Sequence, residues 1–398
     1  MRGIGLTALG TTRYPEGIRN LRVRPRKHSS KGGLDVRLRP AAGALALAGI
    51  LLATGMPVHA AWPDQFADVD SWPTWAAQRR VTPNNVTIYT GGELEEAVWW
   101  ELMIGDPPVS GNAADRRPFR PGDTITRAEF ATILSRALGT GAGDGAGGDW
   151  YKPHVAALAA DAILSDSGDW STPISRQEMG QWMGKALAWY GVPDTGSAPA
   201  FPDIASLAER EDIQRAARAG VIKGYEDGTY RPERTATRTE AAVMIVRFAK
   251  LLRKHPPSPD ELLNVIKASD QLISQLHHDL ATKGSADFSV LEPFGTPMAL
   301  YGYGGLTGAM QEIHDARPEF GWPVLSDYQM TPTLLRDTIA LIHVTFVSQP
   351  YMKSGEPYSG TVKYDRYVYL TKKDGRWRRS NAKEPQEYPP GQEPQPES

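Results

Sequence analysis

Three arginines occupy the same place in a repeated pattern, and their position suits an anion site. Each follows a Ser or Thr directly and precedes a Glu by two residues, in Thr126-Arg127-Ala128-Glu129, Ser175-Arg176-Gln177-Glu178 and Thr237-Arg238-Thr239-Glu240. The Ser/Thr-to-Glu spacing is that of a capping box, so each Arg lies in a first helical turn. A cation is disfavoured there by the helix dipole, by roughly a few tenths of a kcal/mol. Backbone N–H groups and the guanidinium acting together on an anion would explain the placement. The alternative is that each Arg pairs with an Asp of a neighbouring repeat.

Amphipathic helices position these arginines. After each cap, apolar residues recur at helical spacing: Phe130, Ile133, Leu134, Ala137 and Leu138; Met179, Trp182, Met183, Ala186, Leu187 and Tyr190; Ala241, Met244, Ile245, Phe248, Leu251 and Leu252. In the third copy a helix over 207–219 and a Gly-Tyr-Glu-Asp-Gly turn precede the capped helix. Units of about 50 residues cannot bury such faces singly, so we expect the copies to share one core.

These residues resemble the S-layer homology module, which usually occurs in three copies. Its pattern is Phe-x-Asp-Val, a helix, Gly-Tyr-x-Asp-Gly-x-Phe-x-Pro and Ile-Thr-Arg-Ala-Glu-Phe, and residues 201–252 match it nearly throughout. The first copy matches at 66–69 and 119–130. The second keeps 173–178 but lacks the opening Phe-x-Asp and the Gly-Tyr turn. The resemblance implies a mainly α region in which three helix–turn–helix units form a pseudo-trimeric bundle.

The resemblance also implies a ligand. S-layer homology modules bind secondary cell-wall polysaccharide, commonly through a pyruvate ketal whose carboxylate meets the repeated Arg in grooves between repeats. Arg127, Arg176 and Arg238 are therefore expected to bind polysaccharide, with the first and third repeats favoured. Since the third repeat alone has the Arg, the opening Asp and the Gly-Tyr turn, we expect Arg238 to contribute most and Arg176 least.

Four further residues match positions near the family's groove. Asp68 and Asp203 match the opening Asp, which can accept hydrogen bonds from sugar hydroxyls, but each could instead cap the next helix. Gly224 and Tyr225 match the turn that lines the pocket, and Gly224 is equally explained by its backbone angles alone.

No catalytic, cofactor or metal constellation is expected. Cys is absent, which excludes disulfides and thiolate metal sites. Glu129, Glu178 and Glu240 are assigned to helix capping. His277 and His278 are adjacent, about 100° apart on a helix, and lack an i, i+4 partner. The Gly-rich stretch 139–148 lacks the Gly-Lys-Ser/Thr ending of a phosphate loop and is interpreted as a linker.

The N-terminus predicts export. A basic flank ending at Arg39-Pro40, an uncharged run over 41–56 and Val58-His59-Ala60 describe a secretory signal over 1–60, cleaved after Ala60. An uncleaved membrane anchor is the alternative, and a misplaced start codon would explain the long basic leader. Residues 1–60 carry 10 basic and 2 acidic side chains, so the remainder has 34 of the 44 basic and 44 of the 46 acidic ones. We therefore expect no nucleic-acid partner and, after cleavage, no membrane span.

The chain is expected to divide into nine segments: signal peptide 1–60, repeat one 61–138, linker 139–148, degenerate repeat two 149–190, linker 191–200, repeat three 201–252, Pro-rich hinge 253–260, α+β domain 261–383 and disordered tail 384–398. Within the α+β domain we expect helices over 260–282 and 306–316, strands over 338–347 and 361–371, and a hairpin turn at 372–375. A helix leading into such a sheet faintly resembles the cone-shaped nuclear-transport-factor-2-like superfamily.

These observations predict a non-enzymatic, exported cell-surface protein. Its repeats would hold it non-covalently on secondary cell-wall polysaccharide and would present an α+β domain of unknown role. Two alternatives stay open: a surface enzyme with its active site in a pocket of that domain, and a purely structural S-layer component.

Overall fold

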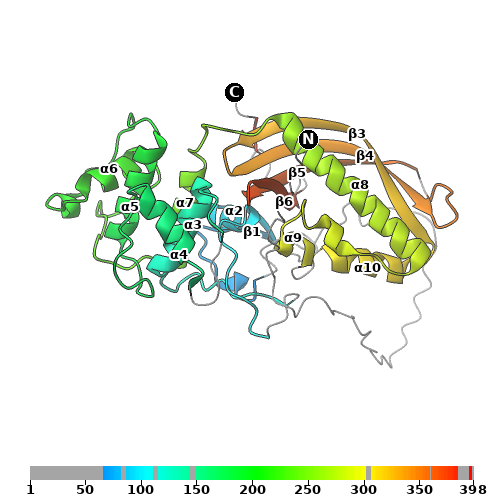
Figure 1. Ribbon diagram of the computed structural model, residues 1–398, viewed down its shortest axis with the longest axis horizontal. Coiled ribbons are helices and arrows are strands. Elements are labelled where there is room, and N and C mark those ends of the chain that lie inside the picture. The colour runs from blue at the N-terminus through cyan, green and yellow to red at the C-terminus, as the bar shows by residue number, and fades with distance from the viewer. Residues whose placement is uncertain are drawn as a thin grey trace, which may run out of the picture. The chain divides into compact units, whose positions relative to one another are not determined.

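The computed structural model describes residues 66–81, 87–110, 115–143, 149–301, 306–358, 360–383 and 394–396. The expected signal peptide and nearly all of the expected tail lie outside these residues. The described chain is a mixed α+β structure in which helices precede a four-stranded antiparallel sheet (Figure 1). Within the described ranges, no helix has the length and apolar character needed to cross a bilayer.

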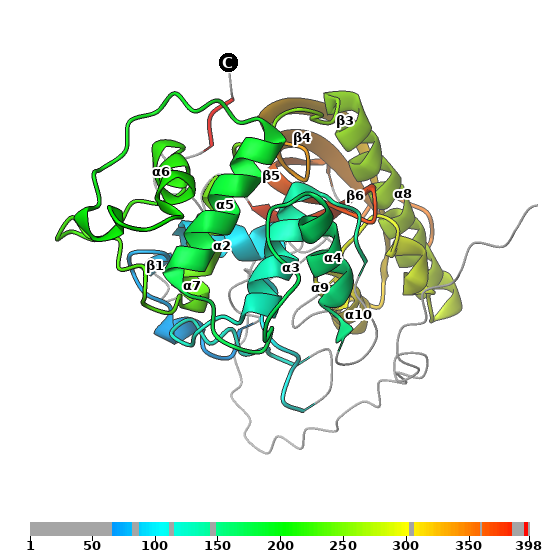
Figure 2. The same ribbon diagram turned by 60° about the vertical axis from the view of Figure 1, so that its left-hand side comes forward.

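The repeats supply α2 (Glu93–Trp99), α3 (Arg127–Leu138), α4 (Lys152–Ala160), α5 (Arg176–Tyr190), α6 (Arg210–Arg218) and α7 (Arg238–Ala249). All three predicted capping boxes form, at Thr126, Ser175 and Thr237. The apolar stripes of α3, α5 and α7 belong to one hydrophobic core, where the rings of Phe130 and Trp182 lie 6.2 Å apart. Figure 2 shows the three helices next to one another. The expectation of a shared core is therefore confirmed.

Repeat one contains elements that we did not predict. Two short strands, β1 (Gln78–Val81) and β2 (Thr87–Gly91), form an antiparallel pair before α2. Helix α2 ends at Trp99, and Glu101 takes a left-handed backbone conformation with φ of 49°. Arg247 of α7 and Lys250, which directly follows that helix, pair with Glu93 and Glu96. These pairs fix α2 on the capped helix of repeat three.

The C-terminal region begins with α8 (Pro259–Lys283), α9 (Pro297–Tyr301) and α10 (Leu306–Ala316), and short 3-10 turns lie at Val69–Ser71, Pro202–Ile204 and Phe288–Leu291. Strands β3 (Phe320–Leu335), β4 (Ile339–Met352), β5 (Val362–Lys373) and β6 (Arg376–Lys383) follow in spatial order β3-β4-β5-β6. Figure 1 shows α8 running along one face of this sheet. Leu262 and Ile266 pack there against the buried side chains of β4 and β5.

The predicted α8, α10, β4 and β5 are present, and so is the hairpin turn. Asp374 and Gly375 have φ of 50° and 73°, as a two-residue type I′ turn requires. Strand β3 was not predicted, because Pro323 and Pro332 argue against a strand. It tolerates both prolines because it lies at the sheet edge and pairs only with β4.

The opposite face of the sheet packs on the segment that repeat one inserts. The rings of Trp99 and Trp100 lie 5.2 and 5.4 Å from that of Tyr369. The indole N–H of Trp100 donates to the carbonyl of Ala340 at 3.0 Å, and the buried Glu101 pairs with Lys373. The core that holds the repeat helices therefore continues into the sheet.

The expected hinge is also tied to the sheet. The backbone N–H of His255 donates to Asp337 at 2.8 Å, and the hydroxyl of Tyr190 donates to the other oxygen of that carboxylate at 2.7 Å. The Lys254 N–H donates to the same Tyr190 hydroxyl at 2.5 Å. Side chains at the end of α5 and before β4 thus hold this Pro-rich segment.

Candidate functional site

A closed ring of backbone hydrogen bonds joins the three segments that enter the capped helices. Ile125 N–H donates to Ala236 at 3.1 Å, Ala236 N–H to Ile174 at 3.0 Å, and Ile174 N–H to Ile125 at 2.9 Å. These residues precede the caps of α3, α7 and α5 by one position. The ring places the first turns of the three helices around a common centre.

The first N–H group of each capped helix is already used by another repeat. Arg127 N–H donates to Thr172 at 2.9 Å, Arg176 N–H to Arg234 at 2.8 Å, and Arg238 N–H to Asp123 at 2.9 Å. The next N–H along each helix also donates to a carbonyl of the same neighbouring loop. The expectation that backbone N–H groups would help to bind an anion is therefore wrong, since protein carbonyls satisfy them. Only the side chains remain for that task.

Each repeated Arg pairs with the capping Glu of another repeat. The nitrogen-to-Oε1 distances are 3.1 Å for Arg127 to Glu178, 3.1 Å for Arg176 to Glu240, and 2.6 Å for Arg238 to Glu129. The Oε2 atom of each Glu accepts from the backbone N–H of its own cap residue, at 3.3 Å for Ser175 and 2.8 Å for Thr237 and Thr126. Each Glu therefore both caps a helix and links two repeats. We call these contacts the Arg127, Arg176 and Arg238 junctions.

At the Arg176 junction, aromatic rings enclose the guanidinium. Arg176 is 3% exposed, and its guanidinium carbon lies 4.7 Å from the ring centre of Tyr225 and 4.8 Å from that of Tyr230. The Tyr225 hydroxyl donates to Glu240 Oε1 at 2.8 Å. The half-exposed Arg234 bonds the same hydroxyl and lies 3.3 Å from that carboxylate oxygen.

These contacts shift the pKa values of Tyr225 and Glu240. Burial, followed by the hydrogen bond to Glu240, raises the pKa of Tyr225. Burial also opposes ionisation of Glu240. The Thr237 N–H, the Tyr225 hydroxyl and the charge of Arg176 together outweigh it and hold the pKa of Glu240 below its ordinary value. The carboxylate therefore stays ionised against its arginines.

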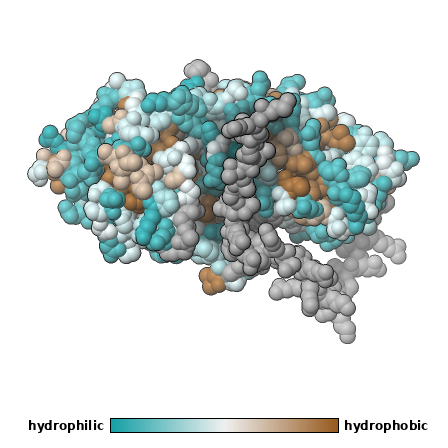
Figure 3. Space-filling view, viewed as in Figure 1, coloured by the Kyte–Doolittle hydropathy of each residue, from teal (hydrophilic) through white to brown (hydrophobic). Residues whose placement is uncertain are grey.

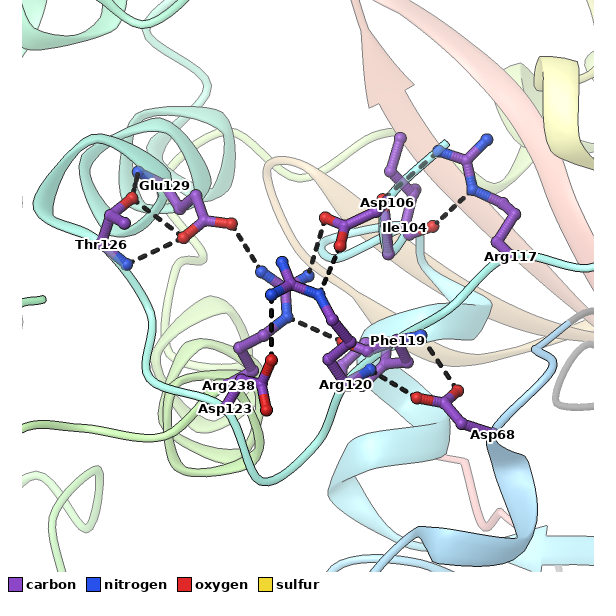
Figure 4. Close-up of polar contacts among 11 residues, drawn as sticks. Asp68, Ile104, Asp106, Arg117, Phe119, Arg120, Asp123, Thr126, Glu129 and Arg238 are labelled. Carbon is purple, nitrogen blue, oxygen red and sulfur yellow. Dashed lines mark hydrogen bonds and ion pairs between the residues drawn. The ribbon is translucent and has the colours of Figure 1, made fainter. Parts of the chain in front are cut away.

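The Arg238 junction carries an additional carboxylate (Figure 4). Arg238 donates from Nε to the carbonyl of Phe119 at 2.7 Å, and its Nη2 lies 3.9 Å from Oδ1 of Asp106. The other oxygen of Asp106 pairs with Arg120 Nε at 2.5 Å, and Arg120 Nη1 pairs with Asp123 at 2.9 Å. Asp106 belongs to the expanded segment of repeat one.

The Arg127 junction is satisfied by carbonyls. Nη1 of Arg127 donates to the carbonyl of Asp169 at 3.3 Å and Nη2 to that of Ser167 at 3.4 Å. Its guanidinium carbon lies 4.7 Å from the ring of Trp170. A Cβ at Gly168 would lie 2.5 Å from Nη1, and φ there is 102°. A glycine in place of the usual Gly-Tyr turn thus makes room for the Arg.

The two opening Asp residues hold backbone. Asp68 accepts from the N–H groups of Phe119 and Arg120 at 3.0 and 2.6 Å, and Asp203 accepts from those of Tyr230 and Arg231 at 3.0 and 2.6 Å. Arg120 and Arg231 are left-handed, with φ of 57° and 58°. Neither carboxylate caps a helix, so the helix-capping alternative is wrong. Each fixes the turn before a Pro.

Gly224 and Tyr225 have different roles in the structure. Gly224 has φ of 70°, and a Cβ there would lie 2.4 Å from the ring of Phe201. Its place is explained by backbone geometry and packing. Tyr225 instead reaches across to Arg176 of the second repeat. We expected the Arg, the opening Asp and the Gly-Tyr turn of one repeat to form one site. The junctions instead form between repeats. Arg176 rather than Arg238 therefore meets the Gly-Tyr turn of repeat three.

The α+β domain contains two buried polar contacts. Asp270 pairs with Arg379 at 2.5 Å and accepts from the Tyr328 hydroxyl at 2.7 Å, beside a small cavity whose apolar wall includes Ile273, Leu291 and Phe294. Burial, followed by the charge of Asp270, raises the pKa of Tyr328. The second contact joins Nδ1 of His277 to Nε2 of His314 at 3.2 Å.

The Asp270–Arg379 pair is hydrogen-bonded within the fold, whereas Nε2 of His277 and Nδ1 of His314 are buried without a hydrogen-bond partner among the described residues. The described residues contain no group of three or more His, Cys, Asp or Glu side chains able to hold a metal ion. Over the same part of the chain, large apolar side chains with high exposure are scattered: Trp75, Val109, Trp189, Val290 and Val324. Hydrophilic colours dominate the face in Figure 3, where apolar residues form separate patches.

Comparison with known proteins identifies a domain family in the third repeat. Residues 200–242 match the family described as S-layer homology domain. The chain is 32% identical over 142 residues to an amylopullulanase of Thermoanaerobacterium thermosulfurigenes, covering 32% of this chain and 8% of that protein. It is 28% identical over 159 residues to an S-layer protein of Bacillus thuringiensis subsp. finitimus, covering 37% and 19%.

A third relative is a cellulosome-anchoring protein of Acetivibrio thermocellus, 28% identical over 170 residues that cover 36% of this chain and 38% of that protein. The chain thus spans less than a fifth of the length of the first two relatives. Residues 200–242 of the chain therefore form an S-layer homology domain. The chain is a protein of the cell surface.

Proposed function

We propose that this chain is exported, loses residues 1–60, and is held non-covalently on the cell wall by repeats that bind a pyruvylated secondary polysaccharide. The observation that carries the proposal is the ring of three capped helices, each with an Arg in its first turn, in a chain whose third repeat matches the S-layer homology domain. One relative is named as an anchoring protein, which supports the same role.

We further propose that the three helix–turn–helix units form a pseudo-trimeric bundle and that the ligand meets the side chains at their junctions. The cyclic order of contacts supports this, because α3 pairs with repeat two, α5 with repeat three, and α7 with repeat one. Arg127, Arg176, Arg238 and Tyr225 lie at these junctions. Asp68, Asp203 and Gly224 shape the turns beside them.

Residues 261–383 would be the part presented at the surface, with a role that anchoring does not define. Their sheet interior is largely filled by apolar side chains, and the Asp270–Arg379 pair is satisfied within the fold. A non-enzymatic role for this domain is consistent with both features.

Retention on purified cell walls tests the proposal. The secreted chain should sediment with walls that carry their secondary polysaccharide and should stay in solution after that polysaccharide has been removed with hydrofluoric acid. An unrelated secreted protein that lacks the repeats serves as the control and should not sediment. Equal sedimentation with stripped and intact walls would count against polysaccharide binding.

A further inference from the structure

We infer that the Arg176 junction is the one open to an external carboxylate, because Asp106 already occupies the Arg238 junction from within the chain. The inference rests on the proposed function and specifies which junction takes the acidic ketal. It reverses the order expected from the sequence, in which Arg238 contributes most and Arg176 least.

The evidence for closure is the placement of Asp106. Its two oxygens face two guanidinium groups, at 3.9 Å from Nη2 of Arg238 and at 2.5 Å from Nε of Arg120 (Figure 4). A ketal carboxylate binding here would need the same N–H groups. Repeat one brings this Asp through its expanded segment between α2 and α3.

The balance of charge points the same way. Among the described residues, two arginines of the Arg238 junction share three carboxylates, those of Asp106, Asp123 and Glu129. Arg117 lies within electrostatic reach of Asp106 as a third cation, so an incoming anion finds no surplus of positive charge there. At the Arg127 junction Nη1 and Nη2 donate to two carbonyls, and the buried Nε forms an ion pair with Glu178 at 3.1 Å but no hydrogen bond with a described residue.

The Arg176 junction differs in the charges that surround it. Among the described residues, Arg176, Arg231 and Arg234 share two carboxylates, those of Glu240 and Asp227. Arg176 is 3% exposed, and its Nη2 makes no hydrogen bond with any described residue. The same holds for Nη2 of Arg238, but that atom has the carboxylate of Asp106 at 3.9 Å. The Arg234 side chain is 43% exposed, and its Nη1 lies 3.3 Å from Oε1 of Glu240. This junction thus combines a surplus cation with unused N–H donors, which suits a carboxylate-bearing sugar.

Calorimetric titration of the full secreted chain with a defined probe tests the inference. The probe is a methyl glucoside carrying a 4,6-pyruvate ketal, and its control is the 4,6-isopropylidene ketal, which lacks the carboxylate. We expect one site for the probe and none for the control. Arg234→Gln should weaken binding by about tenfold or more, since it removes a charge-assisted donor. Because Arg234 is half-exposed, this variant should still fold.

The second variant in this experiment, Asp106→Asn, should gain a binding site. Removing its charge should open the Arg238 junction and raise the stoichiometry from one probe per chain to two. The matched control is Asp260→Asn, which removes the same charge from an exposed position at the start of α8 and should leave the stoichiometry at one.

The outcomes separate this inference from the proposed function. If the wild-type chain binds the probe but Asp106→Asn adds no site, or Arg234→Gln binds as tightly as the wild type, the assignment to the Arg176 junction is wrong and anchoring stands. If the wild-type chain does not distinguish the probe from the neutral ketal, carboxylate recognition fails and both ideas fall.

Discussion

Glu240 accepts from Arg176 on one carboxylate oxygen, at 3.1 Å, and from the backbone N–H of Thr237 on the other, at 2.8 Å. One side chain therefore accepts from a backbone N–H that has no partner within its own helix, and it also joins that helix to another repeat. Because Glu129 and Glu178 do the same, helix formation and repeat assembly depend on the same three carboxylates.

Loss of a cap should destabilise the repeats measurably. Thr237→Ala removes the hydroxyl that accepts from Glu240 N–H at 3.2 Å, and we expect the free energy of unfolding to fall by about 1 kcal/mol. Urea denaturation followed by circular dichroism measures it. Thr195→Ala, at an exposed linker position, should change stability by less than about 0.5 kcal/mol. Equal effects of the two substitutions would contradict the capping role.

Acid should weaken the Arg176 junction through Glu240. Its pKa is lowered in the folded chain, so its contribution is present above the ordinary value of 4.5 and is lost as the pH falls through the folded value. We expect the urea midpoint to drop between pH 5 and about 3, and the drop to be smaller in Glu240→Gln. Glu226→Gln, an exposed neighbour in the same turn, should keep the wild-type slope. An unchanged slope in Glu240→Gln would refute this.

The buried histidine pair should make the α+β domain sensitive to acid at a higher pH. Burial, aided by His314, lowers the pKa of His277 to about 3, so His277 is neutral when folded and charges on unfolding. Its contribution is intact above the ordinary 6.5 and declines as the pH falls below that value.

Hydrogen exchange of α8 and α10, measured between pH 7 and about 4.5, checks this expectation. As the pH is lowered, protection from exchange should decrease in the wild-type chain and should decrease much less in His277→Leu. His255→Ala, which removes an exposed histidine, should behave as the wild type. A wild-type profile that is flat below pH 6.5 would exclude the effect.

The contact between repeat one and the sheet can be tested at Trp100. Trp100→Phe keeps an aromatic ring but removes the N–H that donates to Ala340 at 3.0 Å. Loss of that bond and of ring volume should cost about 1–3 kcal/mol of unfolding free energy. Trp75→Phe is the control, because Trp75 is 60% exposed and should change little. A Trp100→Phe chain as stable as the wild type would mean that this contact adds nothing.

Local features could be predicted from the sequence because their causes lie within a few residues. The capping boxes join positions three apart, and the type I′ turn needs Asp374 and Gly375 side by side. The stripes of α3, α5 and α7 follow from helical periodicity alone. The expected ends of α8 and α10 agree with the structure to within one residue for the same reason.

Partners across the fold could not be predicted, since they depend on how the repeats assemble. Arg176 and Glu240 are 64 residues apart, and Arg238 and Glu129 are 109 apart. Sequence alone showed that each Arg sits where a helix dipole disfavours it, without showing which carboxylate compensates. Strand β3 could not be predicted for a related reason. Its prolines are allowed only because the folded sheet leaves that edge unpaired. The local sequence thus determined the helices, caps and turns, whereas tertiary packing decided which charges meet.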